Sequence, residues 1–475
     1  MTNRFSLFLA LAASTALSAC NLAPKYARPE PALPALPQGG VYPAAATDAP
    51  DISRIGWRDF FVDDRLRQVI QLGLDNNQDL RLAAANVLQA RAQYRAQRAD
   101  LFPAIGVSGT GTYTNTAQFA ASAGGALGGV GVQDVQNFSV TAGITSYEVD
   151  LFGRVRNLSR AAQEQYFASS EAQRATRVSL IGEIASAWLT LASDREQLAI
   201  AQNTLKAFQQ SLELTRAQFR IGVASELESR QAETTYESAR NDVATAQTRI
   251  AQDINALQLL TGATVAPELL PESLGDAKAT IDALPGNVPS EVLLRRPDVL
   301  QAEHQLIAQN ANIGAARAAF FPSLSLTATV GSIASTIGKL FGSNTDTYVV
   351  SPTASLNIFN FGKNQANLEY SKASRDAAVA TYQRTIQTAF REVADALAQR
   401  GTIDEQLRAQ SARANAAEVA AKLSDARYRA GVDSFLTVLD SQRSAYAAEQ
   451  SLVTTRLTRA SNLVTLYRTL GGGLD

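Results

Sequence analysis

The sequence contains little of what catalytic and metal-binding sites require. Among 475 residues it has one cysteine, one histidine and one methionine. A Ser/His/Asp set could form only around His304, and clusters of thiolate and imidazole ligands cannot form at all. We interpret His304 as a helix-surface residue. We therefore expect no catalytic residues, no metal site and no enzymatic activity.

Strong charge and long apolar runs are also missing. The chain carries 43 basic and 44 acidic side chains, a net charge of −1, so it offers no basic surface for nucleic acid. Beyond the N-terminus no apolar run reaches about 18 residues, the length that a membrane-spanning helix requires. If the chain crosses a membrane, we expect it to do so with strands.

The N-terminus has the parts of a secretory signal. Arg4 precedes an apolar run from Phe5 to Leu17, and small residues lead to Cys20. This arrangement resembles the lipobox of bacterial lipoproteins, so Cys20 is predicted to become a lipidated first residue, and its lipid is the only cofactor we expect. An ordinary signal peptide with an accidental cysteine is the alternative. Asn21, in place of the aspartate that retains lipoproteins in the inner membrane, indicates a lipid-anchored outer-membrane protein extending into the periplasm.

The rest of the chain is a tandem repeat. Phe102-Pro103 recurs as Phe321-Pro322, and Phe219–Val223 recurs as Tyr428–Val432, at a nearly constant offset. Seven of the fifteen prolines lie between Pro24 and Pro50, which predicts an extended tether that leaves lipid-anchored Cys20 free to reach the membrane. The predicted organisation is a signal peptide at 1–19, a lipidated tether at 20–56, a first repeat at 57–266, an equatorial segment at 267–296 and a second repeat at 297–475.

Each repeat is predicted to contain a long helical hairpin. Apolar residues recur every seven positions from Ile184 to Phe219, which is typical of coiled-coil packing. A helix from about Arg154 to Ile221 would be about 100 Å long. The second copy has the same period at Val379, Ile386, Val393 and Leu407, interrupted by Arg400. One strong apolar position per heptad suits helices packed side by side in a hollow wall.

Four segments alternate between apolar and Ser/Thr residues with the period of a strand. They begin at Ile105, Phe138, Leu324 and Val350, and phenylalanines cluster at their junctions with the helices. Apolar outside and Ser/Thr inside is the pattern of a transmembrane barrel with a wet lumen, although a soluble sandwich would alternate too. Four strands cannot enclose a channel, so strands must be shared between chains. A trimer would supply twelve strands, and a dimer with eight would also close.

The chain contains five further motifs, namely Cys20 with Pro24–Pro29, Asp150–Arg154, Leu293–Val299 with Ala302-Glu303, Tyr428–Asp440 and Leu470–Gly473. Together these motifs resemble the TolC/OprM family of outer-membrane efflux channels over the full mature length. The tether and lipobox are similar to the OprM branch. The resemblance implies a mixed α and β fold, in which a trimeric 12-stranded transmembrane β-barrel continues as a long periplasmic α-helical barrel and each protomer is a tandem structural repeat. It implies as partners a periplasmic adaptor protein and an inner-membrane resistance-nodulation-division pump.

The resemblance places the functional residues at the ends of the helical hairpins. Gly222 and Gly431 are predicted to form the periplasmic tip turns and to contact the adaptor, because glycine permits a left-handed turn residue. Asp440 matches an aspartate of the family's aperture, and Tyr428 and Asp433 match positions with closing contacts, so these three are predicted to form the gate. The alternative is that Asp433 caps a helix and that Asp440 is a solvated surface acid.

The favoured function is therefore an outer-membrane exit duct of a tripartite efflux system. It would conduct drugs and other small solutes passively from periplasm to exterior when the adaptor and pump open it. A lipoprotein coiled-coil spacer or adhesin is the alternative. That protein would use the heptads, but it has no use for four alternating strands. The glycine-rich run from Gly124 to Gly131 lies between two strands, so it is interpreted as a surface loop rather than a phosphate site.

Overall fold

A computed structural model describes residues 21–30, 39–43, 55–115, 134–274, 279–281 and 290–472. The chain forms two compact units. The first comprises residues 1–29, 88–168 and 303–381, and the second comprises residues 30–87, 169–302 and 382–475. Cys20, the signal peptide and the loop at 120–132 lie outside the described residues.

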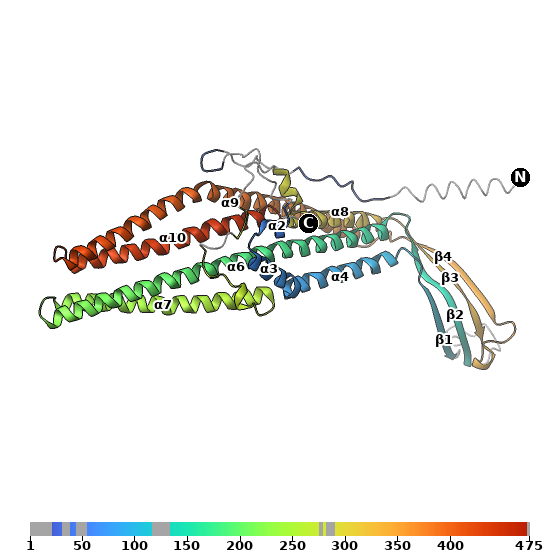
Figure 1. The fold of residues 1–475 in the computed structure, drawn as a ribbon. Coiled ribbons are helices and arrows are strands. Elements are labelled where there is room, and N and C mark those ends of the chain that lie inside the picture. Colours follow the sequence, from blue (N-terminus) through green and yellow to red (C-terminus); the bar gives the residue numbers. More distant parts are fainter. Residues whose placement is uncertain are drawn as a thin grey trace. The chain divides into compact units, whose positions relative to one another are not determined.

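The described elements follow the same order in both halves of the chain, namely helix, two strands and two long helices (Figure 1). The 3₁₀ turns η2 (Pro267–Leu269) and η3 (Ser290–Arg295) lie between the halves, and η4 (Ile337–Lys339) joins the last two strands. The first half contains α2 (Trp57–Phe60), α3 (Asp64–Asn76), α4 (Gln78–Ala99), β1 (Ile105–Asn115), β2 (Asp134–Val149), α6 (Arg154–Arg220) and α7 (Glu226–Thr261). The second contains α8 (Pro297–Ala318), β3 (Ser323–Ala334), β4 (Asp346–Ser355), α9 (Lys363–Arg429) and α10 (Phe435–Thr469).

The four strands form one antiparallel sheet in the order β1-β2-β3-β4, with β1 and β4 at its edges (Figure 1). The register pairs Val140 with Gly109 and Ser332, and pairs Thr141 with Ser108 and Gly331. Since side chains alternate along a strand, the predicted apolar residues share one face of the sheet and the hydroxyl residues share the other. On the hydroxyl face Ser108 and Thr141 are hydrogen bonded at 2.9 Å, and Thr110 and Ser139 at 2.7 Å.

One β-bulge interrupts this register. Between Ile144 and Tyr147, strand β2 contains three steps where β3 contains two, and Ser146 has a φ of 61°. The extra residue returns Tyr147 to the apolar face, opposite Leu326, and places Glu148 on the hydroxyl face. Up to Ile144 the even-numbered residues of β2 lie on the apolar face, and beyond the bulge the odd-numbered residues do.

The sequence predicts three of the four strands well and the fourth less well. The strand predicted from Val350 to Ile358 lies at Asp346–Ser355, because the chain leaves the sheet before the apolar residues Leu356 and Ile358. The junction phenylalanines lie between strands and helices as expected. Phe152 stacks on Phe321 with ring centroids 4.6 Å apart.

The prediction of a long helix from Arg154 is confirmed, since α6 spans 67 residues, and α9 has the same length. The heptad residues Ile184, Leu191 and Leu212 are buried, whereas Phe219, at the end of the series, is 43% exposed. In the described part of the chain no helix is long and apolar enough to cross a membrane.

The core of the second unit surrounds the middle of α6. Trp188 is fully buried, and its indole N–H donates to the carbonyl of Leu269 at 3.0 Å. Phe60 stacks on Tyr467 at 4.3 Å, and burial raises the pKa of the Tyr467 hydroxyl. Short helices α2 and α3, η2 and the C-terminal turn of α10 thus pack on the long helices where the two halves of the chain meet in this core.

A buried arginine ties together three segments of this unit. Arg296 is 8% exposed, and its guanidinium donates to Asp298 at 2.8 and 3.0 Å, to Glu392 at 2.8 Å and to the carbonyl of Thr469 at 2.8 Å. Burial opposes its charge, but the two carboxylates outweigh burial and raise the pKa of Arg296. The network joins the N-terminus of α8 to α9 and to the C-terminal end of α10.

The segment predicted as an extended tether has no helix in its described parts, and these parts pack on the long helices. Residues 39–43 pack on α9 at Gly401, where a Cβ would lie 1.7 Å from the carbonyl oxygen of Val41. Residues 21–29 pack on α6 and α8. The absence of a helical pattern correctly indicated extended chain. Hydrogen bonds, and the close approach that Gly401 allows, hold this chain against the helices.

His304 is less exposed than the sequence suggests. Its side chain is 28% exposed, and its Nδ1 lies 2.7 Å from a carboxylate oxygen of Glu164 on α6. The Phe167 ring lies 5.4 Å away. His304 therefore contributes to the α6–α8 contact of the first unit, which also contains buried Ala161, Ala308 and Ala311.

Two aspartates face each other where α6 packs on α7. One carboxylate oxygen of Asp253 is buried without a hydrogen-bond partner. Burial, together with the charge and hydrogen bond of Asp194, raises the pKa of Asp253 to about 6, and Arg249 offsets this only in part. Asp253 consequently keeps its proton up to about pH 6.

Replacing Asp253 with asparagine should make the protein more stable at pH values above about 6 but not at pH 4. Because the folded-state pKa of about 6 exceeds the ordinary 3.8, the stabilising proton is fully present below about pH 4 and is lost as pH rises through 6. The shift corresponds to about 3 kcal/mol, and partial exposure reduces this to about 1–2 kcal/mol. Urea unfolding at pH 4 and pH 8 measures the effect. Exposed Glu237→Gln on the same helix is the control, and an equal gain at both pH values would contradict the assignment.

Candidate functional site

The candidate site is built on the two turns that end the long helices. Gly222 and Gly431 both have a φ of 76°, in the left-handed region that favours glycine. The N–H of Val223 donates to the carbonyl of Gln218 at 2.9 Å, and that of Val432 donates to Arg427 at 2.9 Å. These are the hydrogen bonds of a Schellman motif. The repeat therefore produces the same helix stop twice, and a side chain at either glycine would strain it.

The helices that leave the two turns begin with hydroxyl caps. The Ser225 side chain accepts from the backbone N–H of Glu228 in a full capping box, and Ser434 accepts from Thr437. Asp433 is thus not the cap of α10, and the helix-cap interpretation is wrong. Its carboxylate instead accepts from Nε and Nη2 of Arg427 at 2.7 and 2.9 Å, which lowers the pKa of Asp433.

Tyr428 connects the two hairpins near their tips. Its hydroxyl donates to Oε1 of Gln218 on α6 at 2.7 Å, and its ring lies 5.7 Å from the ring of Phe435. Burial, helped by the charge of Glu228, raises the pKa of Tyr428, so the hydroxyl stays protonated and able to donate. Below it lies an apolar cluster of Leu212, Ala232, Phe435 and Leu439.

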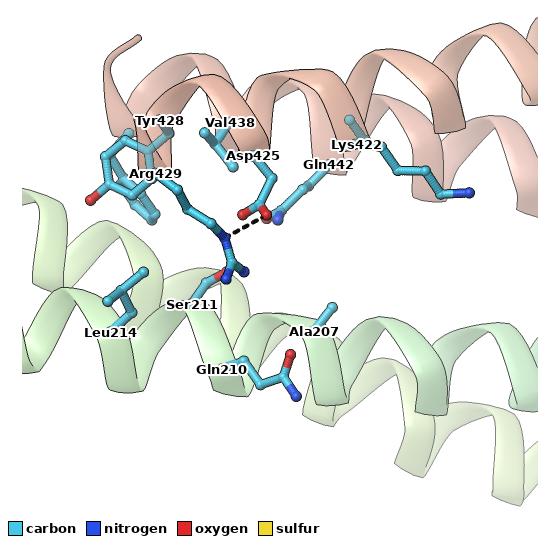
Figure 2. A pocket seen from close by; sticks show the side chains of 12 residues that line it. Ala207, Gln210, Ser211, Leu214, Lys422, Asp425, Tyr428, Arg429, Val438 and Gln442 are labelled. Atoms are coloured by element: carbon cyan, nitrogen blue, oxygen red, sulfur yellow. Dashed lines mark hydrogen bonds and ion pairs between the residues drawn. The ribbon is translucent and has the colours of Figure 1, made fainter. Parts of the chain in front are cut away.

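A groove of about 260 Å³ runs between the hairpins beside this cluster. Figure 2 shows side chains from both hairpins around it, and the dashed line marks the ion pair in which Arg429 donates to Asp425 at 2.7 Å. The walls carry both charges and apolar groups. Lining residues include Gln210, Ser211, Leu214, Lys422, Asp425, Arg429, Phe435 and Gln442.

The structure brings together some of the predicted site residues. Tyr428, Asp433 and Gly431 lie at one turn, whereas Gly222 lies at the other. Asp440 is exposed on α10. Gln218 and Arg427, which hold Tyr428 and Asp433, were not predicted, although Gln218 stands one position before Phe219 in the repeat motif. Within the described residues, no group of three or more His, Cys, Asp or Glu side chains could hold a metal ion.

Similarity to known proteins extends over both repeats. The sequence profile of outer membrane efflux proteins matches residues 69–263 and 288–472. The chain belongs to the outer membrane efflux protein family. This efflux protein is 44% identical over 460 residues to "Toluene efflux pump outer membrane protein TtgC" of Pseudomonas putida, with 96% of this chain and 93% of that protein covered.

Solved structures agree with this membership. A membrane protein from Pseudomonas aeruginosa superimposes with a TM-score of 0.87 at 38% identity, covering 96% of this chain and 98% of that one. The open state of the MtrE outer membrane channel of Neisseria gonorrhoeae gives a TM-score of 0.83 at 37% identity, covering 96% and 99%. The efflux protein therefore has the mixed helix-and-strand fold of these outer membrane channels, and it is a transport protein rather than an enzyme.

Proposed function

We propose that this efflux protein is the exit duct of a tripartite pump and conducts small solutes passively across the outer membrane. The observation that carries the proposal is the sheet, which has one mainly apolar face and one face rich in Ser and Thr over four strands. Exposed apolar residues of the first face include Val107 at 76%, Val330 at 63% and Val350 at 66%. Lipid outside and water inside would satisfy both faces.

The duct requires more than one chain. Strands β1 and β4 are the edges of the sheet, and an open edge in lipid leaves backbone groups without partners. A homotrimer would join each β4 to the β1 of the next copy and form twelve strands. The long helices would then continue the barrel as a periplasmic tube.

The tips are the proposed contact for a periplasmic adaptor, which would link the duct to an inner-membrane resistance-nodulation-division pump. Exposed apolar residues flank both turn glycines, with Ile221 at 76% and Val223 at 73% at one tip, and Val432 at 62% and Leu436 at 60% at the other. Such residues mark an interaction surface. TtgC is named for toluene efflux, and by analogy we propose small, largely apolar compounds as the solutes here.

We further propose a lipid anchor at Cys20 and a gate at the tips. Asp440, Tyr428 and Asp433 would form the gate, with three copies of the Asp440 carboxylate around one aperture. Like charges there repel and attract cations, so hydrogen bonds such as Tyr428–Gln218 would keep the tip closed.

Single-channel conductance in planar bilayers tests this function. We expect wild type to open rarely, and Asp440→Ala and Tyr428→Phe to give larger or longer openings under the same salt. Tyr370→Phe, at a 75% exposed tyrosine of α9, is the control. Channels that conduct alike in all variants would keep the duct but refute the gate. Absence of conductance in every variant would instead support a lipoprotein spacer.

A further inference from the structure

The segment at 21–29 makes more polar contacts than a passive tether requires. Three side chains of α8 contact it at intervals of seven residues, namely Glu303, Asn310 and Arg317. Arg317 donates to the carbonyl of Leu22 at 3.0 Å, and Asn310 donates to the carbonyl of Pro24 at 2.8 Å. Because seven residues are close to two helical turns, these side chains form one row along the helix.

The C-terminal end of the segment is bound through its own side chains rather than through its backbone carbonyls. The Glu303 carboxylate accepts from the hydroxyl of Tyr26 at 3.0 Å and from Nε and Nη2 of Arg28 at 2.8 and 2.7 Å. Glu303 is only 7% exposed, and a bidentate pair with arginine is among the stronger charge-assisted contacts. The segment thus runs antiparallel to α8, from Arg317 towards Glu303.

The other end is fixed by shape. A Cβ on Gly314 would lie 2.7 Å from the Cβ of Ala23 and 2.8 Å from its Cα, so only glycine leaves room for the chain there. Asn157 of α6 is 2% exposed and donates to the side-chain oxygen of Asn21 at 2.9 Å. Asn157 lies in the first turn of α6, a few residues after the end of β2. This contact therefore holds Asn21 near the start of α6.

We propose that the groove between α6 and α8 is a binding site for an extended peptide, and that its resident ligand is the chain's own segment 21–29. The site would recognise two backbone carbonyls, a small residue over Gly314, and a Tyr-x-Arg pair at Glu303. One consequence rests on the proposed lipidation of Cys20. Because Cys20 directly precedes Asn21, its lipid would lie at the junction of strands and helices instead of at the end of a free tether.

Trypsin cleavage of purified full-length protein tests the docking directly. Lys25 is exposed, but the Lys25–Tyr26 bond can enter a protease only after the segment leaves the groove. We expect Gly314→Val and Asn310→Ala to speed cleavage at this bond by about 10-fold or more, measured by mass spectrometry. Asn312→Ala is the matched control, since Asn312 donates to Gln309 on its own helix. Equal rates in wild type and Asn310→Ala would overturn the proposal.

Two further variants remain informative if Gly314→Val does not fold. Arg28→Glu alone should speed cleavage, and combining it with Glu303→Arg should restore much of the protection. A chain in which 21–29 is replaced by a Gly/Ser linker should bind a labelled synthetic peptide of residues 21–30 saturably, and adding Asn310→Ala to that chain should weaken this binding. Failure to bind would contradict the recognition site. Both readouts report docking whether or not the protein conducts, so they are independent of the proposed transport function.

Discussion

Arginine in place of Val140 should prevent the protein from assembling in the outer membrane. Val140 lies near the middle of β2, on the apolar face between Gly109 and Ser332. An arginine facing lipid costs about 2–4 kcal/mol at the bilayer midplane, and a trimer would contain three of them. We expect loss of the membrane-inserted oligomer, measured by outer-membrane fractionation and by gel mobility without heating. Leu326→Arg on the same face should have the same effect.

The adjacent residue provides the control. Thr141 occupies the same depth in the strand but faces the hydroxyl side, where its Oγ1 lies 2.9 Å from Oγ of Ser108. Thr141→Arg would place its charge in the wet interior, so assembly should be retained. Equal assembly of Val140→Arg and Thr141→Arg would show that the apolar face does not meet lipid.

Replacing Arg296 with methionine should destabilise the second unit by about 3–5 kcal/mol. The change keeps a long side chain but removes the guanidinium between Asp298 and Glu392, leaving partly buried carboxylates without their cation. It also removes the donor to the Thr469 carbonyl. Urea unfolding of the detergent-solubilised protein measures the loss.

Arg295 provides a control next in sequence, because it is exposed. Arg295→Met should change the unfolding free energy by less than about 0.5 kcal/mol. Adding Glu392→Gln to Arg296→Met removes one unpaired charge and should recover part of the stability. If the double variant is no more stable than Arg296→Met, the loss reflects packing rather than the ion network.

The sequence predicts features that depend on periodicity and repetition. Seven-residue spacing from Ile184 to Phe219 predicted a long helix, which the structure places at Arg154–Arg220, and alternation identified which side chains of β1, β2 and β3 share a face. Glycine in the repeated turn motif correctly indicated the left-handed residues Gly222 and Gly431, since their conformation is a local property of the chain.

Contacts between distant segments could not be predicted in this way. Nothing near Tyr428 in sequence indicates Gln218, which is 210 positions away. The Leu293–Val299 motif was used only for its resemblance to a family, whereas in the structure Arg296 binds carboxylates of two helices. The tether was interpreted from its prolines alone, because its hydrogen-bond partners on α6 and α8 lie more than 100 residues away.

The bulge at Ser146 limits how β2 can change length. In a strand between lipid and water, successive side chains face the two sides alternately. A one-residue insertion or deletion therefore moves every side chain beyond it to the opposite face. In β2 the bulge between Ile144 and Tyr147 already contains one such extra residue. Removing Ser146 would delete only the extra residue and leave Tyr147 on the apolar face and Glu148 on the hydroxyl face, so β2 can lose one residue at the bulge, whereas a loss elsewhere in the strand would exchange the two faces beyond it.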